Sequence, residues 1–178
     1  QHAHEAPPAH VRTVMLVGFP MAPWRKPQGS ALFWPMQLDL ELRIIDLLKD
    51  AGYEVLYKAH PDRLKEIEGI FNEKAKVIKE PFEQVFGIAD ALVFPVIRTT
   101  AFNFGLCTKK PVVGLIMHDE YPPPLPEPMA LLKKRCHLLY THFDEKGRVV
   151  FDGEELKEAL AKSPEVPDME FVEKYLFP

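Results

Sequence analysis

The stretch that decides the fold runs from Ala91 to Met117 and reads ALVFPVIRTTAFNFGLCTKKPVVGLIM. It begins with a short apolar run over 91–94 and ends with a second one over 111–117, with a helical segment over 100–107 between them. Continuous apolar runs are typical of strands that are covered on both faces in a parallel sheet. The stretch therefore predicts a βαβ unit, whose crossover is right-handed for steric reasons.

A turn with one cation and two hydroxyl groups, formed by Arg98, Thr99 and Thr100, opens the helix of this unit. The first N–H groups of a helix lack intrahelical partners, and the helix macrodipole adds partial positive charge there. The turn therefore predicts an anion site. The alternative is that Thr99 or Thr100 is an ordinary helix cap.

The remaining chain repeats the alternation of strands and helices. Strands are expected over 12–17, 53–58, 75–79 and 136–140, and helices over 36–51, 62–71, 83–89, 129–135, 153–162 and 165–177. The proline-rich segment 121–128 is expected to form neither regular helix nor central strand. The pattern predicts an α/β fold with a doubly wound, mostly parallel open sheet and helices on both faces, and with ligands outside the carboxyl ends of the strands.

Length and composition are those of one well-buried domain, with 178 residues of which 47% are hydrophobic. We expect a flexible tail over 1–11, the α/β domain over 12–162, and a carboxyl-terminal helix over 163–178 that folds back on the domain. The net charge of −4 argues against a nucleic-acid surface. The basic cluster Lys133-Lys134-Arg135 is predicted to be a solvated helix face.

Targeting and redox signals are sparse. Cys107 and Cys136 are too few for a disulfide framework and are expected to be buried thiols in a reducing compartment. The sequence has no long apolar run for a membrane span. We therefore expect a cytoplasmic protein, with the inner face of the membrane as an alternative location. Because the chain begins at Gln1, we expect it to be part of a longer protein.

Several common sites are excluded by the sequence. The chain continues from its first strand as Gly18-Phe19-Pro20, so the dinucleotide fingerprint GxGxxG is absent there. The chain contains no GxxxxGK[ST] phosphate loop and no GxSxG nucleophile elbow. The end of the first strand also lacks the acidic residues of a phosphoacceptor receiver. Nicotinamide dehydrogenases, common nucleotide triphosphatases and serine hydrolases are therefore disfavoured.

Three short motifs nonetheless follow in a recognisable order. They are Tyr57-Lys58-Ala59-His60-Pro61, then Arg98-Thr99-Thr100-Ala101-Phe102, and then Lys110-Pro111-Val112-Val113. This order and spacing resembles the carboxyl-terminal, Rossmann-like half of GT-B glycosyltransferases of the bacterial capsule and surface-polysaccharide type. In those enzymes a K-x-H-P motif, a Ser/Thr-rich turn and a G-K-P-V-V motif occupy the corresponding places.

The resemblance implies a domain that binds a nucleotide-linked sugar or polyol donor. It assigns the donor phosphates to His60 and to the turn with Thr99 and Thr100. From their positions after the strands, Arg98 is expected to join this phosphate site, and Arg25 or Lys26 could reach it from the long loop after the first strand. The alternative for Arg25 and Lys26 is that they are solvated charges on that loop. Asn103 stands where many such enzymes carry a glutamate, so it is expected near the donor ribose or base. Neither a metal nor a cofactor is implied, and the resemblance identifies no catalytic residue in this chain. It also implies a separate amino-terminal half that binds the acceptor, without which this chain would be inactive or weakly active.

Two alternatives stay open. One is a GT-B-type sugar epimerase half, for which Asp119 or Glu120 would have to supply the acid and base chemistry. The other is a non-catalytic α/β module that contacts a partner protein through the loop over 19–35 or through the proline-rich segment 121–128.

Overall fold

The predicted βαβ unit is present in the computed structural model, which describes residues 10–19, 32–65, 67, 69–117, 125–162 and 167–177. The unit runs from β4 (Ala91–Phe94) through α3 (Thr100–Leu106) to β5 (Val112–Met117). β4 and β5 pair in parallel, with Val93 opposite Val113. The unit therefore lies in the middle of the molecule, as its apolar strands require.

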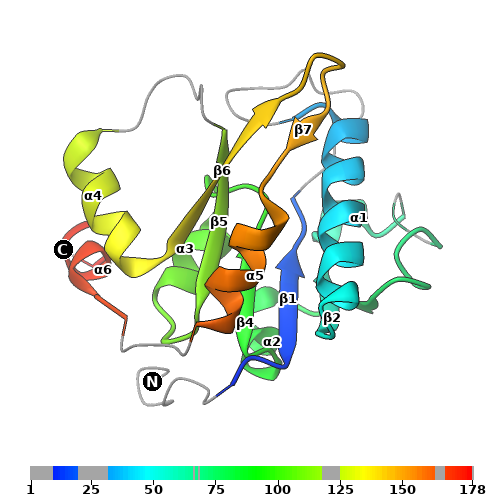
Figure 1. Ribbon diagram of the computed structural model, residues 1–178. Helices are drawn as coiled ribbons and strands as arrows, with labels where there is room; N and C mark the ends of the chain where they lie inside the picture. The colour runs from blue at the N-terminus through cyan, green and yellow to red at the C-terminus, as the bar shows by residue number, and fades with distance from the viewer. Residues whose placement is uncertain are drawn as a thin grey trace.

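A seven-stranded sheet extends on both sides of this unit (Figure 1). Its other strands are β1 (Thr13–Val17), β2 (Glu54–Lys58), β3 (Lys76–Ile78), β6 (His137–Phe143) and β7 (Val149–Val150). The strand order is β3-β2-β1-β4-β5-β6-β7, and every neighbouring pair is parallel except β6 and β7. The chain thus winds outward from β1 in one direction and from β4 in the other.

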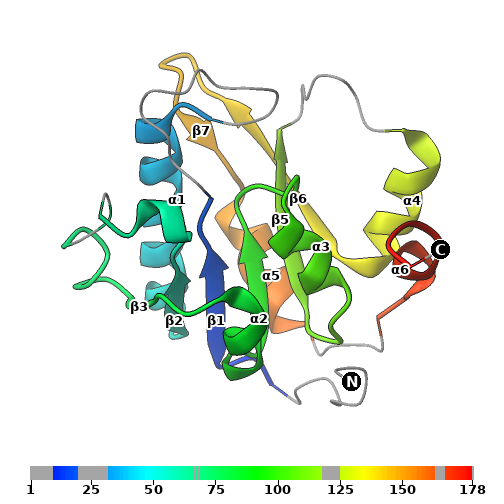
Figure 2. The same ribbon diagram turned by 180° about the vertical axis from the view of Figure 1, so that it is seen from behind.

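Helices cover both faces of the sheet, which confirms the predicted fold class. One face carries α1 (Trp34–Asp50) and α5 (Gly153–Ala161), which are in front in Figure 1. The other face carries α2 (Phe82–Val85), the 3₁₀ turn η2 (Phe86–Ile88), α3, α4 (Pro126–Arg135) and α6 (Glu170–Tyr175). Figure 2 shows α2 and α3 in front of the sheet from behind.

Alternate residues of the central strands supply two separate cores. Val14 and Leu16 of β1 pack toward α1, whereas Met15 and Val17 pack toward α2 and α3. Because successive side chains in a strand point to opposite faces, a strand with two covered faces must be apolar throughout. This is why the central strands read as continuous apolar runs in the sequence.

Two predictions of local structure are wrong. The segment 62–71 was expected to be a helix, but its described residues form the 3₁₀ turn η1 (Pro61–Arg63) followed by turns, and Gly69 has φ +80. A left-handed residue cannot continue a right-handed helix. In addition, α4 begins at Pro126, inside the segment that was expected to be non-helical. Proline is tolerated in the first turn because the N–H groups there lack intrahelical acceptors.

The carboxyl-terminal elements pack mainly around α4. Val172 of α6 is buried in the same apolar cluster as Leu132 of α4. An ion pair with 3.5 Å between Lys134 Nζ and Glu170 Oε2 joins the two helices at the surface. Within the described residues, no helix combines the length and apolar character that a membrane span requires.

The basic cluster at the end of α4 differs from its prediction at one residue. Lys133 and Lys134 are exposed, but Arg135 is 3% exposed, and its Nε donates to the carbonyl oxygen of Leu106 at 2.7 Å. The guanidinium therefore caps the last turn of α3, where carbonyl groups lack intrahelical partners. Cys136 is buried as predicted, and burial raises the pKa of its thiol to about 12, whereas Cys107 is only half-buried.

Candidate functional site

The switch point of the sheet lies between β1 and β4, because the chain leaves β1 toward α1 on one face and leaves β4 toward α3 on the other. Doubly wound sheets bind ligands outside the carboxyl ends of the strands at such a point. β2 and β4 are the two neighbours of β1. At the usual strand spacing, their ends lie about 10 Å apart on either side of β1.

The residues at or after the ends of these strands define the candidate site, called here the carboxyl-edge site. Its members are Gly18, Lys58, His60, Arg98, Thr99 and Thr100. The sheet topology brings the predicted phosphate residues from two separate motifs to one edge. Arg25 and Lys26, which were predicted to contribute from the loop after β1, lie outside the described residues, as do Asp119 and Glu120 of the epimerase alternative.

His60 follows β2 and is half-buried, with 34% of its side chain exposed. Its Nδ1 accepts a hydrogen bond from the backbone N–H of Asp62 at 3.2 Å. This bond assigns the proton of the neutral ring to Nε2. Burial lowers the pKa of His60, the charges of Lys58 and Arg63 act in the same direction, and the Asp62 carboxylate opposes them. His60 is therefore a neutral hydrogen-bond donor at neutral pH.

Lys58 is a member of the site that the sequence analysis did not assign. It is the last residue of β2, is 3% exposed, and its Nζ donates to the carbonyl oxygen of Ala59. Burial lowers the pKa of its amine, and the carboxylates of Glu83 and Glu80 oppose that shift. The signal was present in the sequence, because Lys58 is the lysine of the K-x-H-P pattern that contains His60.

The hydroxyl turn after β4 is built as a helix cap. Thr99 Oγ1 accepts a hydrogen bond from the backbone N–H of Phe102 at 3.0 Å, which makes Thr99 the N-cap of α3. This bond uses the oxygen as an acceptor and leaves its hydrogen as a donor. Thr100, Arg98 and Asn103 are exposed on the same turn and the helix that follows it. The cap alternative and the anion alternative are therefore compatible at Thr99.

A buried polar cluster fixes the chain where it leaves β1. Glu41 of α1 and Arg63 of η1 are both fully buried, with 3.1 Å between Arg63 Nη1 and Glu41 Oε2. Arg63 Nη1 also donates to the carbonyl oxygen of Phe19 at 2.7 Å, and the Tyr57 hydroxyl donates to Glu41 Oε2 at 2.7 Å. Gln37 Nε2 donates to the other oxygen of the Glu41 carboxylate at 2.8 Å. Burial and the Glu41 carboxylate together raise the pKa of Tyr57.

Gly18 is packed against this cluster. A Cβ at this position would lie 2.3 Å from Tyr57 Oη, which no side chain could accommodate without displacing the tyrosine. The Gly18 N–H donates to the carbonyl oxygen of Lys58 at 2.9 Å. The glycine therefore leaves room for the Tyr57 side chain beside the end of β1.

Cavities differ between the two edges of the sheet. A cavity of about 20 Å³ at the carboxyl edge is lined by Ile97 and Met117 among others, and it could hold about one water molecule. A groove of about 1040 Å³ lies at the opposite, amino edge. Among the described residues, no group of three or more His, Cys, Asp or Glu side chains could hold a metal ion.

Comparison with known proteins adds little. A solved structure titled "Structure of MT0777" is similar to this chain, with a TM-score of 0.48 and 14% sequence identity over 84% of this chain and 93% of that one. No protein family and no curated protein matches the sequence.

The buried ion pair predicts a non-additive mutant cycle. Arg63→Met should lower the free energy of unfolding by about 3–5 kcal/mol, because it removes the cation beside a buried carboxylate. Adding Glu41→Gln to Arg63→Met should recover part of this loss, because the amide oxygen still accepts from Tyr57 but carries no charge. Urea denaturation measures the free energy of unfolding of the single and the double variant. A double variant that is less stable than Arg63→Met alone would contradict this account.

The environment of His60 predicts its titration. Its NMR midpoint should lie below the ordinary value of about 6.5, and Asp62→Asn should lower it further because Asp62 opposes the shift. The unfolded chain takes up the proton at a higher pH than the folded chain, so this contribution to stability is present above about pH 6.5 and is lost as the pH falls through the folded pKa. Stability should therefore fall less steeply with acidification in His60→Gln than in the parent chain. A midpoint above the ordinary value would contradict the assignment.

Proposed function

We propose that this chain is the nucleotide-sugar-binding half of a metal-independent GT-B-type glycosyltransferase of surface-polysaccharide synthesis, and that the carboxyl-edge site binds the phosphates of the donor. One observation carries the proposal: the two motifs with phosphate-binding chemistry follow β2 and β4, which flank β1 at the switch point of the sheet. A spacing of about 10 Å between the strand ends suits a nucleotide diphosphate that crosses the end of β1.

The side chains at this edge suit a departing phosphate. Negative charge grows on the diphosphate of the nucleotide-sugar as the glycosyl group leaves. Hydrogen-bond donors that are fixed in position stabilise this charge more in the transition state than in the ground state. His60 would donate from Nε2, Thr99 and Thr100 from their hydroxyls, and Arg98 would supply positive charge. Asn103, one turn further along α3, would contact the ribose or base through its amide.

The surroundings of His60 hold its imidazole in position as a hydrogen-bond donor. The bond from the Asp62 N–H holds the imidazole in one tautomer, and the low pKa keeps it neutral. Removing a neutral hydrogen-bond donor from water costs less free energy than removing a cation. The separate amino-terminal half would bind the acceptor and supply the catalytic base. A cytoplasmic location would follow from the use of nucleotide-linked sugars.

Isothermal titration calorimetry of the chain with UDP, CDP, CMP and GDP tests the proposal. We expect one of these nucleotides to bind with a dissociation constant below millimolar, and His60→Ala with Thr100→Ala to weaken that binding about tenfold or more, as expected for the loss of two hydrogen bonds to a charged group.

The matched control is His10→Ala with Thr13→Ala, which changes the same residue types at the amino end of β1. It should bind like the parent chain. The proposal fails if none of the four nucleotides binds at millimolar concentration, or if both double variants bind equally well.

A further inference from the structure

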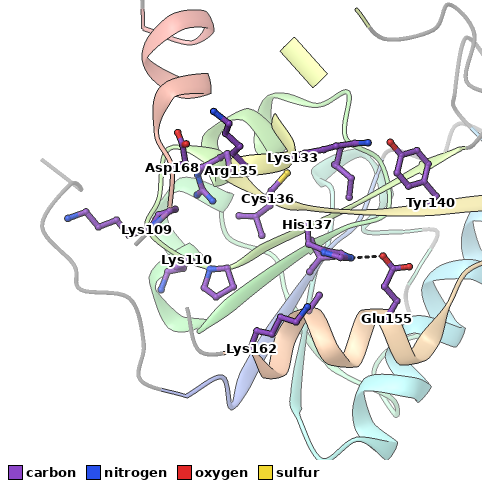
Figure 3. Close-up of a pocket in the computed structure, with 17 residues that line it drawn as sticks. Lys109, Lys110, Lys133, Arg135, Cys136, His137, Tyr140, Glu155, Lys162 and Asp168 are labelled. Carbon is purple, nitrogen blue, oxygen red and sulfur yellow. Dashed lines mark hydrogen bonds and ion pairs between the residues drawn. The ribbon is translucent and has the colours of Figure 1, made fainter. Parts of the chain in front are cut away.

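The groove at the amino edge of the sheet lies far from the carboxyl-edge site, at the opposite ends of the strands. It has a volume of about 1040 Å³ and lies between the end of α4, the beginning of β6 and α5 (Figure 3). We call it the β6 groove. Its lining includes Lys133 from α4, His137, Leu138 and Tyr140 from β6, and Lys162 just beyond α5.

The beginning of β6 is an open strand edge. β7 pairs with β6 only at His142 and Phe143, so among the described strands the segment 137–139 pairs with β5 alone. Just beyond the paired residues, the Asp144 N–H donates to the carbonyl oxygen of Arg148 at 2.9 Å. Because the backbone N–H and C=O groups of successive residues point to alternate sides of a strand, those of the even-numbered β6 residues point to the β7 side. Leu138 therefore presents its N–H and C=O at the outer edge, where no described residue bonds to them.

The β6 groove is basic although the whole chain carries a net charge of −4. Six of its lining residues are cations, namely Lys109, Lys110, Lys133, Lys134, Arg135 and Lys162, and two are carboxylates, namely Glu155 and Asp168. Both carboxylates are engaged: Glu155 Oε1 lies 2.8 Å from His137 Nε2, and Asp168 Oδ1 accepts from the Glu170 N–H at 2.9 Å.

The lysines of the groove differ in whether their side chains form hydrogen bonds or ion pairs. Lys110 donates to the carbonyl oxygen of Ala89 at 2.6 Å, and Lys134 pairs with Glu170. The side chains of Lys109 and Lys162 form no hydrogen bond or ion pair with the residues that the structure describes. Lys133 Nζ lies 5.2 Å from the centre of the Tyr140 ring. The positive charge of the groove is therefore only partly neutralised.

The charges decide what can pair with this edge. A second copy of the chain would bring the lysines of two grooves together, which is unfavourable, and lysines beside an edge strand are a known protection against such pairing. An acidic strand would relieve the repulsion. In Figure 3, Lys133 lies on one side of the β6 ribbon and Lys162 on the other. Consecutive residues of an added strand point to opposite sides, so two adjacent carboxylates could reach both lysines.

We propose that the β6 groove binds an extended acidic segment of a partner protein, which pairs as a strand with the outer edge of β6 at Leu138 while its carboxylates contact Lys133 and Lys162. Main-chain hydrogen bonds would provide the register, and the charges would provide the selectivity. This proposal does not depend on the function of the carboxyl-edge site.

A labelled, blocked hexapeptide with two adjacent glutamates flanked by valine and threonine tests the proposal with the unaltered chain. Binding is measured by fluorescence anisotropy, and exchange of the Leu138 amide by NMR. We expect the peptide to bind and the Leu138 amide to become protected. Lys133→Glu with Lys162→Glu should weaken binding about tenfold or more, because two surface attractions become repulsions. The same charge reversal at the exposed Lys49 and Lys146, outside the groove, is the matched control and should have little effect.

Two further peptides separate strand pairing from charge attraction. One carries lysines in place of the glutamates and should not bind. The other keeps the glutamates but has alternate backbone nitrogens methylated, and it should bind much more weakly because methylation removes the donors that pair with β6. The proposal is overturned if the methylated peptide binds equally well or if the acidic peptide does not bind. It is also overturned if sedimentation shows that the chain dimerises through this edge.

Discussion

The buried ion pair between Glu41 and Arg63 is the constraint on which the carboxyl edge of this protein depends. It joins helix α1 to the segment that follows β2, and through Phe19 and Tyr57 it holds the end of β1 in the same cluster. Two charges without solvent exposure cost several kcal/mol each to bury, and such a pair repays that cost only with good geometry and further hydrogen bonds. Here the carboxylate is also bonded to Gln37 and Tyr57, and Arg63 Nη1 also donates to the carbonyl oxygen of Phe19.

This cluster has a direct consequence for the site. Arg63 lies three residues after His60, and the pair with Glu41 fixes the turn that orients the imidazole. Gly18 leaves room for the Tyr57 side chain beside the end of β1. The side chains of Glu41, Tyr57 and Arg63 bond to one another toward the core, and the hydrogen-bond donors of His60 and the Thr99–Thr100 turn belong to the adjacent edge. A site of this kind is held by its supporting residues rather than by loops alone.

Much of the fold could be predicted from the sequence because apolar runs report strands that are covered on both faces. The strands of the central unit lie within one residue of their predicted ends. The prediction failed where long-range contacts decide local structure. The apolar spacing of Ile67 and Phe71 is typical of a helix, yet both residues are buried while lying outside any helix or strand. Local sequence could not predict that Arg63 and Arg135 are buried, because their partners lie far along the chain.

The candidate site was predictable to a similar degree. The rule that parallel strands end at one edge was enough to place His60 with Arg98, Thr99 and Thr100. The tautomer of His60 and the burial of Lys58 required coordinates, because they depend on Asp62 and on packing around β2.

The central claim is that one ligand contacts the ends of β1, β2 and β4 together. A titration of isotope-labelled protein with UDP, or with the nucleotide that binds best, followed by amide chemical shifts, tests it most directly. We predict that Gly18, His60, Thr99 and Thr100 shift together and saturate with one dissociation constant. Shifts confined to the β6 groove, or shifts at His60 and Thr100 that saturate with different constants, would contradict it.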